Sequence, residues 1–471
     1  MKKMLMALSL SGALLGGSAV VWAEDAASTP VAAEQTMAAT DTAAATPETV
    51  VTEAPAIEEA TPAAEAAPTV DTGDTAWILV STALVLLMTI PGLALFYGGM
   101  VRKKNVLSTM MFSLSAAILV SLIWVIVGYS LAFSGSGAYV GDLAKAMLNG
   151  VAFDALSGTI PESLFVIFQM TFAIITVAII SGSIADRMKY SAFMAFIAIW
   201  VILVYAPITH WVWAADGWLF KAGALDFAGG TVVHINSGVA GLVAAYMLGK
   251  RTGLGRESMA PHNLTLTVVG ASLIWVGWFG FNGGSALGAG ARASMAILVT
   301  QVAAAAAAFS WLVVERVVRG KASVLGGASG AVAGLVVITP AAGFVGVGGA
   351  LVMGLIGGVV CFWGITALKR LLKADDALDA FGLHAVGGMV GAVLTGVFYS
   401  DEIIKAAGVV LAPTFAGQLW IQVEGVLATI AYSAVVTFII LKVIDLVIGI
   451  RVSADDERMG LDLSQHGERI E

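Results

Sequence analysis

The chain has 471 residues, of which 59% are hydrophobic and only 12% are charged, about half the charged fraction that is usual in a soluble domain. This composition indicates a polytopic membrane protein. The formal net charge of −8 argues against a nucleic-acid partner. The single cysteine, Cys361, excludes a disulfide framework or a thiolate metal cluster within one chain, and we expect no metal and no cofactor.

The first 74 residues differ in composition from the rest of the chain. Residues 1–23 have a basic start, an apolar centre and a small-residue end, Val21-Trp22-Ala23, which is the pattern of a cleavable signal peptide. Residues 24–74 are rich in Ala, Thr, Pro and Glu and contain no aromatic residue, so they cannot bury enough surface to fold. We interpret them as a disordered acidic arm outside the cytosol, and a specific binding role is the alternative.

Eleven apolar runs follow between Ala76 and Ile450. A helix needs about 20 apolar residues to cross roughly 30 Å of hydrocarbon. The approximate cores of the runs are residues 76–99, 106–133, 162–184, 192–209, 228–249, 263–283, 294–314, 324–339, 345–368, 381–398 and 418–448. The sequence therefore predicts an all-α membrane protein with eleven transmembrane helices.

The basic residues are distributed unevenly between the loops. With the N-terminus outside the cytosol, the five inner loops contain fourteen of them: Arg102, Lys103, Lys104, Arg187, Lys189, Lys250, Arg251, Arg256, Arg316, Arg319, Lys321, Lys369, Arg370 and Lys373. The outer loops contain four: Lys145, Lys221, Arg292 and Lys405. This bias is typical of membrane proteins with that orientation, and it predicts a cytosolic C-terminal tail at residues 451–471.

The helix count and the glycine content indicate how the helices are arranged. The 54 glycines allow helices to approach closely without side chains between them. An odd count of eleven suggests two five-helix halves plus one extra helix. Two halves with an odd number of helices each lie inverted in the membrane.

Two of the five histidines lie deep in predicted helices, at equivalent positions of these halves. His234 falls in the fifth helix and His384 in the tenth, and an aspartate precedes each, Asp226 by eight residues and Asp379 by five. Asp226 either caps its helix or contacts a substrate. Ionisable groups at membrane depth usually face a pathway, and a neutral imidazole offers one donor and one acceptor. The pair therefore lines a pore for a small hydrogen-bonding solute or relays a proton, with hydrogen-bonded packing as the alternative.

Aromatic residues and one serine gather near the predicted outer ends of the helices. They are Phe172, Trp213, Phe281 and Ser285. Aromatic faces attract compact cations, and a hydroxyl can accept a hydrogen bond from an ammonium-like ion. An interfacial aromatic belt explains the same spacing equally well.

Several long motifs carry a resemblance to a known family. They are MTIPGLALFYGGMVRKKNVLS at residues 88–108, DFAGGTVVHINSGVAGLVAAY, GWFGFNGGSA, ITPAAGFVGVGGA and DAFGLHAVGG. Together they closely resemble the ammonium transporter (Amt/Mep/Rh) family, with the bacterial Amt branch nearest. The resemblance extends from about residue 75 to the tail segment ERMGLDLSQHGE.

The resemblance implies an eleven-helix protomer in a homotrimer, with a pore through each transporter domain at residues 75–450. It assigns roles to nine residues: ammonium recruitment to Trp213, Ser285 and Phe168, the gate to Phe172 and Phe281, the pore to His234 and His384, and the entrance to Asp226 with Thr339 near it. It also makes the cytosolic tail a docking and coupling element. A PII-type signalling protein at the cytosolic face is a plausible partner.

The function that we expect is import of ammonium nitrogen across a bacterial inner membrane. Ammonium is recruited outside and deprotonated, and ammonia passes the histidines. The alternative is an ammonium sensor that signals through a partner at the tail. A transporter for a larger solute would need an acidic site deep in the membrane, and Asp445 is the only candidate. We do not expect an enzyme, because no nucleophile, metal cluster or phosphate loop stands out.

Overall fold

The computed structural model describes residues 69–470. The predicted signal peptide and residues 24–68 of the predicted arm lie outside the described residues. Within residues 69–470, ten helices are long and apolar enough to cross a membrane, and an eleventh, Val324–Ile338, is shorter. The prediction of an all-α membrane protein with eleven spans is therefore confirmed.

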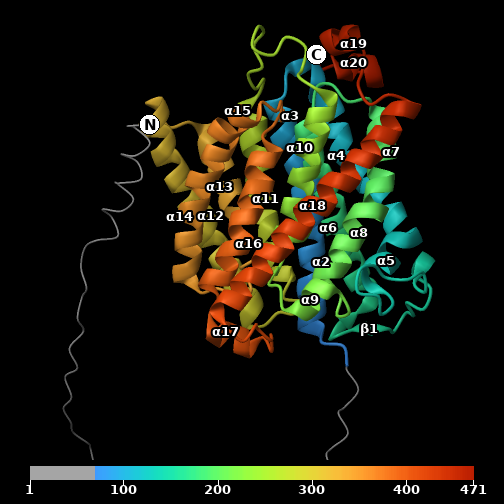
Figure 1. Cartoon of the computed structure of the whole chain (residues 1–471), viewed down its shortest axis with the longest axis vertical. Helices are drawn as coiled ribbons and strands as arrows, with labels where there is room; N and C mark the ends of the chain where they lie inside the picture. Colours follow the sequence, from blue (N-terminus) through green and yellow to red (C-terminus); the bar gives the residue numbers. More distant parts are fainter. Residues whose placement is uncertain (1–68, 471) are drawn as a thin grey trace, which may run out of the picture. The chain divides into compact units, whose positions relative to one another are not determined.

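The first five spans contain several π-helical turns within α-helices. Their elements are α2 (Thr72–Leu87), η1 (Met88–Leu93) and α3 (Ala94–Met100); η2 (Lys103–Asn105), α4 (Val106–Ile123), η3 (Trp124–Gly128) and α5 (Tyr129–Phe133); α6 (Glu162–Ile184); α7 (Tyr190–Trp200), η5 (Val201–Tyr205) and α8 (Ala206–Trp213); and η6 (Gly230–Ile235) with α10 (Asn236–Leu248). Short elements in the connections are η4 (Ala146–Leu148), the hairpin β1 (Leu156–Ser157) and β2 (Ile160–Pro161), and α9 (Trp218–Ala222). These connections lie at the end of the bundle opposite the C-terminal tail (Figure 1).

The remaining spans lead to two short helices in the tail. The spans are α11 (Leu264–Gly284); α12 (Ala291–Arg319); α13 (Val324–Ile338); α14 (Val347–Trp363) with η7 (Gly364–Leu368) and α15 (Lys369–Leu372); η8 (Phe381–Ala385) with α16 (Val386–Phe398); and α18 (Phe415–Val447). Helix α17 (Asp401–Ala406) precedes the last span, and α19 (Ala454–Met459) and α20 (Leu461–His466) form the tail.

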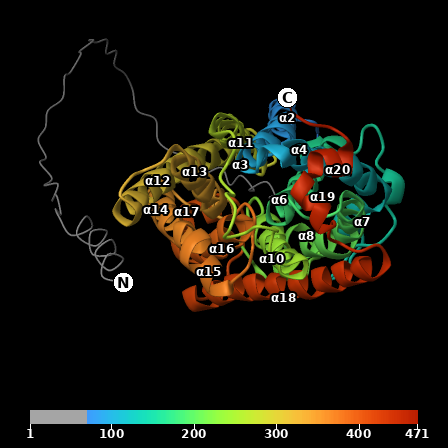
Figure 2. The ribbon, with the colours of Figure 1, turned by 90° about the horizontal axis from the view of Figure 1, so that it is seen from above.

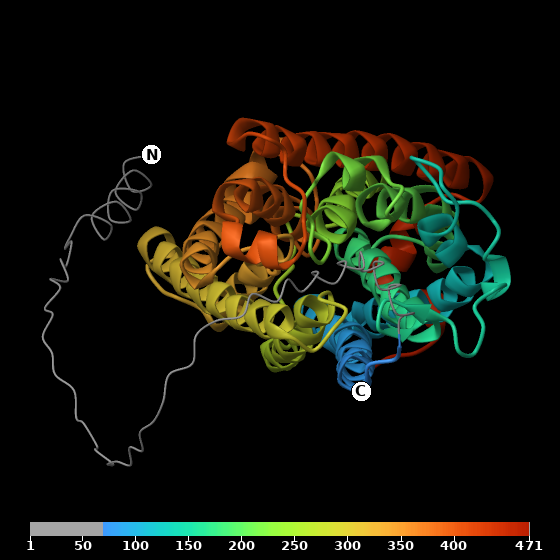
Figure 3. The ribbon, with the colours of Figure 1, turned by 90° about the horizontal axis from the view of Figure 1, so that it is seen from below.

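The two sets of five spans stand side by side, and the last span covers one flank of both. Seen from the tail end, α2 to α10 lie on one side and α11 to α16 on the other (Figure 2). Helix α11 packs against α2 and α3, while α18 packs against α7, α10 and α16. The view from the opposite end shows α18 running along the same flank (Figure 3).

Small residues allow the closest helix contacts. A Cβ atom added at Gly354 in α14 would lie 2.5 Å from the carbonyl oxygen of Ala303 in α12. No real Cβ atom occupies such a position, so only glycine permits this crossing. The glycine content therefore serves packing in this part of the bundle.

The two histidine-bearing spans share a local pattern. Each begins with a π-helical turn that contains the histidine, η6 for His234 and η8 for His384. A glycine follows each histidine by four residues, and an added Cβ would meet the other segment: Gly238 faces Ala385, and Gly388 faces Gly230 and His234. These reciprocal contacts bring the two segments together at the level of the histidines.

Candidate functional site

A cavity of about 800 Å³ opens at the end of the bundle away from the tail. Phe172, Trp213, Asp226 and Ser285 are among its lining residues. The indole nitrogen of Trp213 donates to the carbonyl oxygen of Asp226 at 2.8 Å, which fixes the ring. The Ser285 hydroxyl donates to the carbonyl oxygen of Phe281 at 2.8 Å, so its own oxygen remains able to accept a hydrogen bond.

Stacked phenylalanines lie beneath this cavity. The ring centroids of Phe172 and Phe281 are 4.3 Å apart at an interplanar angle of 26°, and Trp213 meets Phe172 edge-on at 5.6 Å. Phe168 is fully buried and packs edge-on against Phe172 at 5.1 Å. The structure thus places Phe168 behind the ring of Phe172 and not among the residues that line the cavity.

The two deep histidines meet directly below the phenylalanines. The Nδ1 atoms of His234 and His384 are 3.2 Å apart, and the rings are nearly parallel, with centroids separated by 5.3 Å. His234 is fully buried and His384 almost fully. The sequence-based expectation that the two halves bring these residues together is confirmed by this contact.

The contact makes the two neutral rings inequivalent. One Nδ1 must donate and the other must accept, and each neutral ring carries one hydrogen. The donating ring therefore presents a bare Nε2 acceptor, while the accepting ring presents an Nε2–H donor. Nε2 of His234 is buried without a hydrogen-bond partner in the described residues. The pair thus offers one acceptor and one donor to a small neutral molecule.

Trp278 and Thr339 support the histidine pair from one side. The ring of Trp278 stacks on His234 with centroids 5.3 Å apart at 20°. Its indole nitrogen donates to the Thr339 hydroxyl at 2.9 Å. The resemblance places Thr339 near Asp226, and the adjacent Pro340 does accept a backbone hydrogen bond from Phe227 at 3.0 Å. The side chain of Thr339, however, accepts its hydrogen bond from Trp278 and makes none to Asp226 among the described residues.

The space next to His384 is small and apolar. A hollow of only about 10 Å³ lies there, and its lining is apolar apart from the ring of His384 and the indole of Trp278: Met88, Leu93, Phe96, Ile175, Ile179, Ile274, Trp278, Val332 and His384. A space of that size holds at most one water molecule. An ion with a hydration shell does not fit.

Asp226 organises the start of the first histidine segment. Its carboxylate accepts hydrogen bonds from four consecutive backbone N–H groups, those of Gly229, Gly230, Thr231 and Val232, at 2.6 to 3.1 Å. A helix start leaves its first N–H groups without internal partners, and this carboxylate satisfies them. The capping interpretation of Asp226 is confirmed, while a direct contact with substrate stays a prediction.

Asp376, and not Asp379, is the counterpart of Asp226 in the second half. It lies eight residues before His384, as Asp226 lies eight before His234. It accepts hydrogen bonds from the backbone of Ala380 and Phe381 at 3.2 and 2.8 Å and from the Ser183 hydroxyl at 2.7 Å. Asp379 instead pairs with Lys369 at 2.6 Å. Equal spacing of the two Asp–His pairs was the signal that identifies Asp376.

Sequence reasoning also missed Gln169 and Trp278. Gln169 lines the outer cavity, and its side-chain oxygen is buried without a partner in the described residues. Nothing in the local sequence distinguishes these two residues from others of α6 and α11. The surroundings of each are formed by residues far along the chain.

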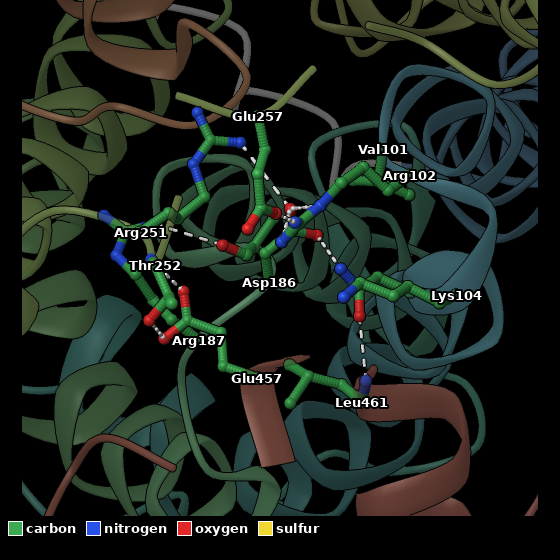
Figure 4. A network of polar contacts seen from close by, with 12 residues as sticks. Val101, Arg102, Lys104, Asp186, Arg187, Arg251, Thr252, Glu257, Glu457 and Leu461 are labelled. Atoms are coloured by element: carbon green, nitrogen blue, oxygen red, sulfur yellow. Dashed lines mark hydrogen bonds and ion pairs between the residues drawn. The ribbon is translucent and has the colours of Figure 1, made fainter. Parts of the chain in front are cut away.

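The C-terminal tail joins several loops at the opposite end of the bundle, as Figure 4 shows. Glu457 accepts from the Thr252 backbone at 2.5 Å and pairs with Arg451 at 2.8 Å. The Asn105 side chain accepts from the Leu461 backbone at 2.8 Å and donates to Asp186.

Buried arginines extend this network to the loop before the second histidine segment. Arg102 and Arg251 both reach Asp186, and Arg251 pairs with Asp375 at 2.9 Å. Burial tends to raise the pKa of Asp375, but Arg251 and Arg187 outweigh it and hold that pKa below its usual value. The tail is thus connected to the loop that starts the His384 segment.

Fold and site together define a class of protein. Membrane-crossing helices enclose a buried histidine pair, with two stacked phenylalanines and an aromatic cavity above it, an organisation that suits a channel or transporter for a small solute.

Comparison with known proteins identifies the family. The sequence model of the Ammonium Transporter Family matches residues 76–470. The chain is 51% identical over 399 residues to the ammonium transporter of Bacillus subtilis, an alignment that covers 84% of this chain and 98% of the relative. It is 46% identical over 399 residues to ammonium transporter Amt1 of Archaeoglobus fulgidus, with the same two shares. The chain belongs to the ammonium transporter family, and its function is ammonium transport across a membrane and not enzymatic catalysis.

Solved structures agree with this assignment. The fold matches Mep2 of Candida albicans with a TM-score of 0.77 at 37% identity, covering 85% of this chain and 90% of that one. It matches a protein described as a sensor Amt protein with a TM-score of 0.77 at 30% identity, covering 84% and 98%.

Proposed function

We propose that ammonium binds in the outer cavity, loses a proton above the stacked phenylalanines, and crosses as ammonia past the histidine pair. The observation that carries the proposal is the 3.2 Å contact between two buried imidazoles beneath an aromatic stack. The proposed direction is inward, from the end that bears the aromatic cavity to the end that bears the tail.

Recruitment rests on Trp213, Phe172 and Ser285, which line the same cavity. Aromatic faces attract ammonium through their quadrupole, and Ser285 offers an oxygen acceptor. Potassium has a similar size but donates no hydrogen bond, so the serine favours ammonium. Phe168 supports the gate ring from behind, and Asp226 shapes the entrance through the backbone that it caps.

Deprotonation follows from the energetics of the passage. Moving an ion into an apolar environment without compensating partners costs several kcal/mol or more. The stacked rings and the apolar hollow beside His384 provide few such partners. Ammonia avoids the cost of charge burial, and the donor and acceptor Nε2 positions of the histidine pair replace part of its hydration.

The setting that we propose is a bacterial inner membrane, with the N-terminus outside the cytosol and the tail inside. The excess of basic residues in the loops at the tail end supports this orientation. A homotrimer with a pore in each protomer, and a PII-type protein at the tail end, are further parts of the proposal and rest on membership of the family.

The test compares histidine variants in proteoliposomes. We expect His234→Ala and His384→Ala to lower ammonium-over-potassium selectivity by about tenfold or more, equivalent to ~1.4 kcal/mol of barrier difference. Uptake and current are measured for ammonium, methylammonium and potassium in the same vesicles. His262→Ala, in a loop outside the passage, is the control. Unchanged selectivity in both pore variants would overturn the assigned role.

A sensor is the second candidate, because the tail network offers a route from the passage to a cytosolic partner. The match to a sensor Amt protein also favours it. Negligible transport together with ammonium-dependent binding of a partner at the tail is the result that distinguishes a sensor. Normal uptake by the wild-type protein contradicts it.

A further inference from the structure

Arg292 brings an unpaired positive charge to the outer cavity. It lies in the first turn of α12 and lines the cavity together with Trp213 and Ser285. The start of a helix favours anions and not cations, so local structure does not explain an arginine at this position. Its Nε donates to the carbonyl oxygen of Gly343 at 3.2 Å, and within residues 69–470 its side chain forms no ion pair. Because a guanidinium stays protonated, this wall of the cavity carries a full positive charge.

Two aromatic rings hold the guanidinium of Arg292 in place. Its central carbon lies 4.9 Å from the ring centroid of Phe227 and 5.1 Å from that of Phe344, and the two rings meet edge-on at 5.6 Å. Both phenylalanines line the same cavity. Phe227 directly follows Asp226, whose carbonyl oxygen accepts from Trp213. The charge is therefore fixed about one aromatic ring away from the proposed recruitment site.

The other charged groups of the cavity do not pair with Arg292. Among the described residues that line it, the only other charged ones are Lys221 and Asp226. Lys221 pairs with Asp216 at 2.7 Å. The carboxylate of Asp226 is occupied by four backbone N–H groups at a helix start, whose dipoles balance its charge. A cavity that gathered cations by long-range attraction would carry surplus negative charge, and this cavity does not.

We propose that Arg292 is a specificity-determining residue: it weakens the binding of every cation in the outer cavity, and only ammonium escapes this repulsion, by losing a proton. The inference rests on the proposed function, recruitment followed by deprotonation. In that step one N–H bond of ammonium breaks, its electron pair stays on ammonia, and the proton passes to a water molecule of the open cavity. Once the proton has left to the outer solution, ammonia is not repelled. Potassium has no proton to lose and stays repelled.

This repulsion predicts a specific change in transport kinetics. For two charges roughly 10 Å apart, at an effective dielectric constant between about 20 and 80, repulsion weakens binding about twofold to fifteenfold. The charge acts on bound ammonium but not on ammonia in the passage, so its removal stabilises only the bound ground state. The KM for ammonium and the maximal rate should then fall by the same factor, which leaves their ratio unchanged.

The test compares ammonium uptake by Arg292→Gln, Arg292→Met and Arg292→Lys in proteoliposomes, with potassium as inhibitor. Met keeps an apolar contact with the two phenyl rings, and Lys keeps the charge. Lys221→Gln is the matched control, because it removes one charge from the same cavity at a side chain that is 58% exposed and screened by solvent. We expect KM, maximal rate and the inhibition constant of potassium to fall together by about twofold to fifteenfold in the two neutral variants. Arg292→Lys and Lys221→Gln should stay near the wild type.

Thermal unfolding in detergent checks that the variants fold. Titrated with ammonium chloride at constant ionic strength, it also measures ammonium binding without transport, because a ligand stabilises the folded state that binds it. A wild type that binds ammonium without uptake contradicts the proposed function, and tighter binding by the neutral variants then still supports the role of Arg292. Unchanged binding in both neutral variants overturns that role. Arg292→Lys behaving like Arg292→Gln, or Lys221→Gln having an equal effect, overturns it as well, since packing or general charge would then be the cause.

Discussion

At the scale of single residues, Thr339 fixes the position of Trp278, whose ring stacks on His234. Its hydroxyl accepts from the buried indole of Trp278 and donates to the Leu335 carbonyl oxygen at 2.7 Å. Trp278 stacks in turn on His234. A buried N–H without a partner costs about 1–3 kcal/mol, so the position of Trp278 is sensitive to this one hydroxyl.

Thr339→Val tests that dependence. We expect a loss of about 1–3 kcal/mol in the free energy of unfolding, together with reduced uptake, because the indole is left unpaired beside the pore. Thr395→Val is the control, since Thr395 is also fully buried but donates only to Gly391 in its own helix. Thermal unfolding and liposome uptake are measured on both. Equal losses in the two variants would contradict a special role for Thr339.

Ser285 permits a second test at the same scale, on substrate binding. A hydrogen bond to a charged donor contributes about 1.5–3 kcal/mol, so Ser285→Ala is expected to raise the KM for ammonium roughly tenfold or more with a smaller change in maximal rate. Ser294→Ala serves as control, because that hydroxyl bonds to a carbonyl four residues earlier, as Ser285 does, but is exposed outside the cavity. An unchanged KM for Ser285→Ala would remove this residue from the recruitment site.

At the scale of elements, the spans could be predicted closely because the membrane constrains length and composition together. The predicted cores 162–184 and 381–398 coincide with α6 and with η8 plus α16. Other spans continue beyond their cores by several residues, as α12 does to Arg319. Basic and small residues extend a helix past the hydrocarbon, and hydropathy does not register them.

The site was predictable only where chemistry stands out from an apolar background. His234, His384 and Asp226 are rare residue types at that depth, so their importance could be inferred from sequence. The partner of Trp278 and the burial of Phe168 behind Phe172 could not, because both depend on packing between spans distant in the chain. The π-helical turns that carry the histidines leave no pattern in the sequence that we could use.

The two aspartates that start the histidine segments accept different numbers of hydrogen bonds, and the effect of this difference on stability can be measured. Asp226 accepts four backbone N–H groups, while Asp376 accepts two and a hydroxyl. An asparagine places an NH₂ group where one oxygen was. At position 226 this NH₂ group leaves two backbone N–H donors without an acceptor. At position 376 it leaves only one, the N–H group of Phe381.

We expect Asp226→Asn to destabilise the protein by about 2–6 kcal/mol and Asp376→Asn by about 1–3 kcal/mol, because each buried unpaired donor costs about 1–3 kcal/mol. Thermal unfolding of the two variants in the same detergent gives the order. A larger loss at position 376 would show that capping by backbone donors is not what these carboxylates contribute.

At the scale of the whole molecule, the tail holds together loops of the first half of the bundle and reaches the second half only through Arg251. Glu457 bonds to Thr252 after the fifth span, and Asp462 accepts from the Ser108 backbone at the start of the second span at 2.7 Å. Through Arg251 the same network reaches Asp375, one residue before the cap of the His384 segment. Ion pairs thus connect the tail to the start of the His384 segment, and we expect a change in tail position to reach that segment through them.

A substitution of Glu457 is the most direct way to interrupt the network between the tail and the His384 segment. Its side chain is fully buried and holds Arg451 and both polar groups of Thr252. Glu457→Ala leaves both donors of Thr252 without an acceptor and removes the ion-pair partner of Arg451, which keeps its bonds to the carbonyl oxygens of Leu248 and Lys250. We expect a local loss of about 2 kcal/mol or more. Hydrogen exchange in α19 and α20 should then accelerate roughly thirtyfold, and uptake should fall although the pore residues are intact.

Asp455→Ala is the control, since Asp455 lies on the same short helix but is 91% exposed and pairs only with Arg458. If Glu457→Ala frees the tail without changing uptake, the tail stabilises the loops but does not govern the passage.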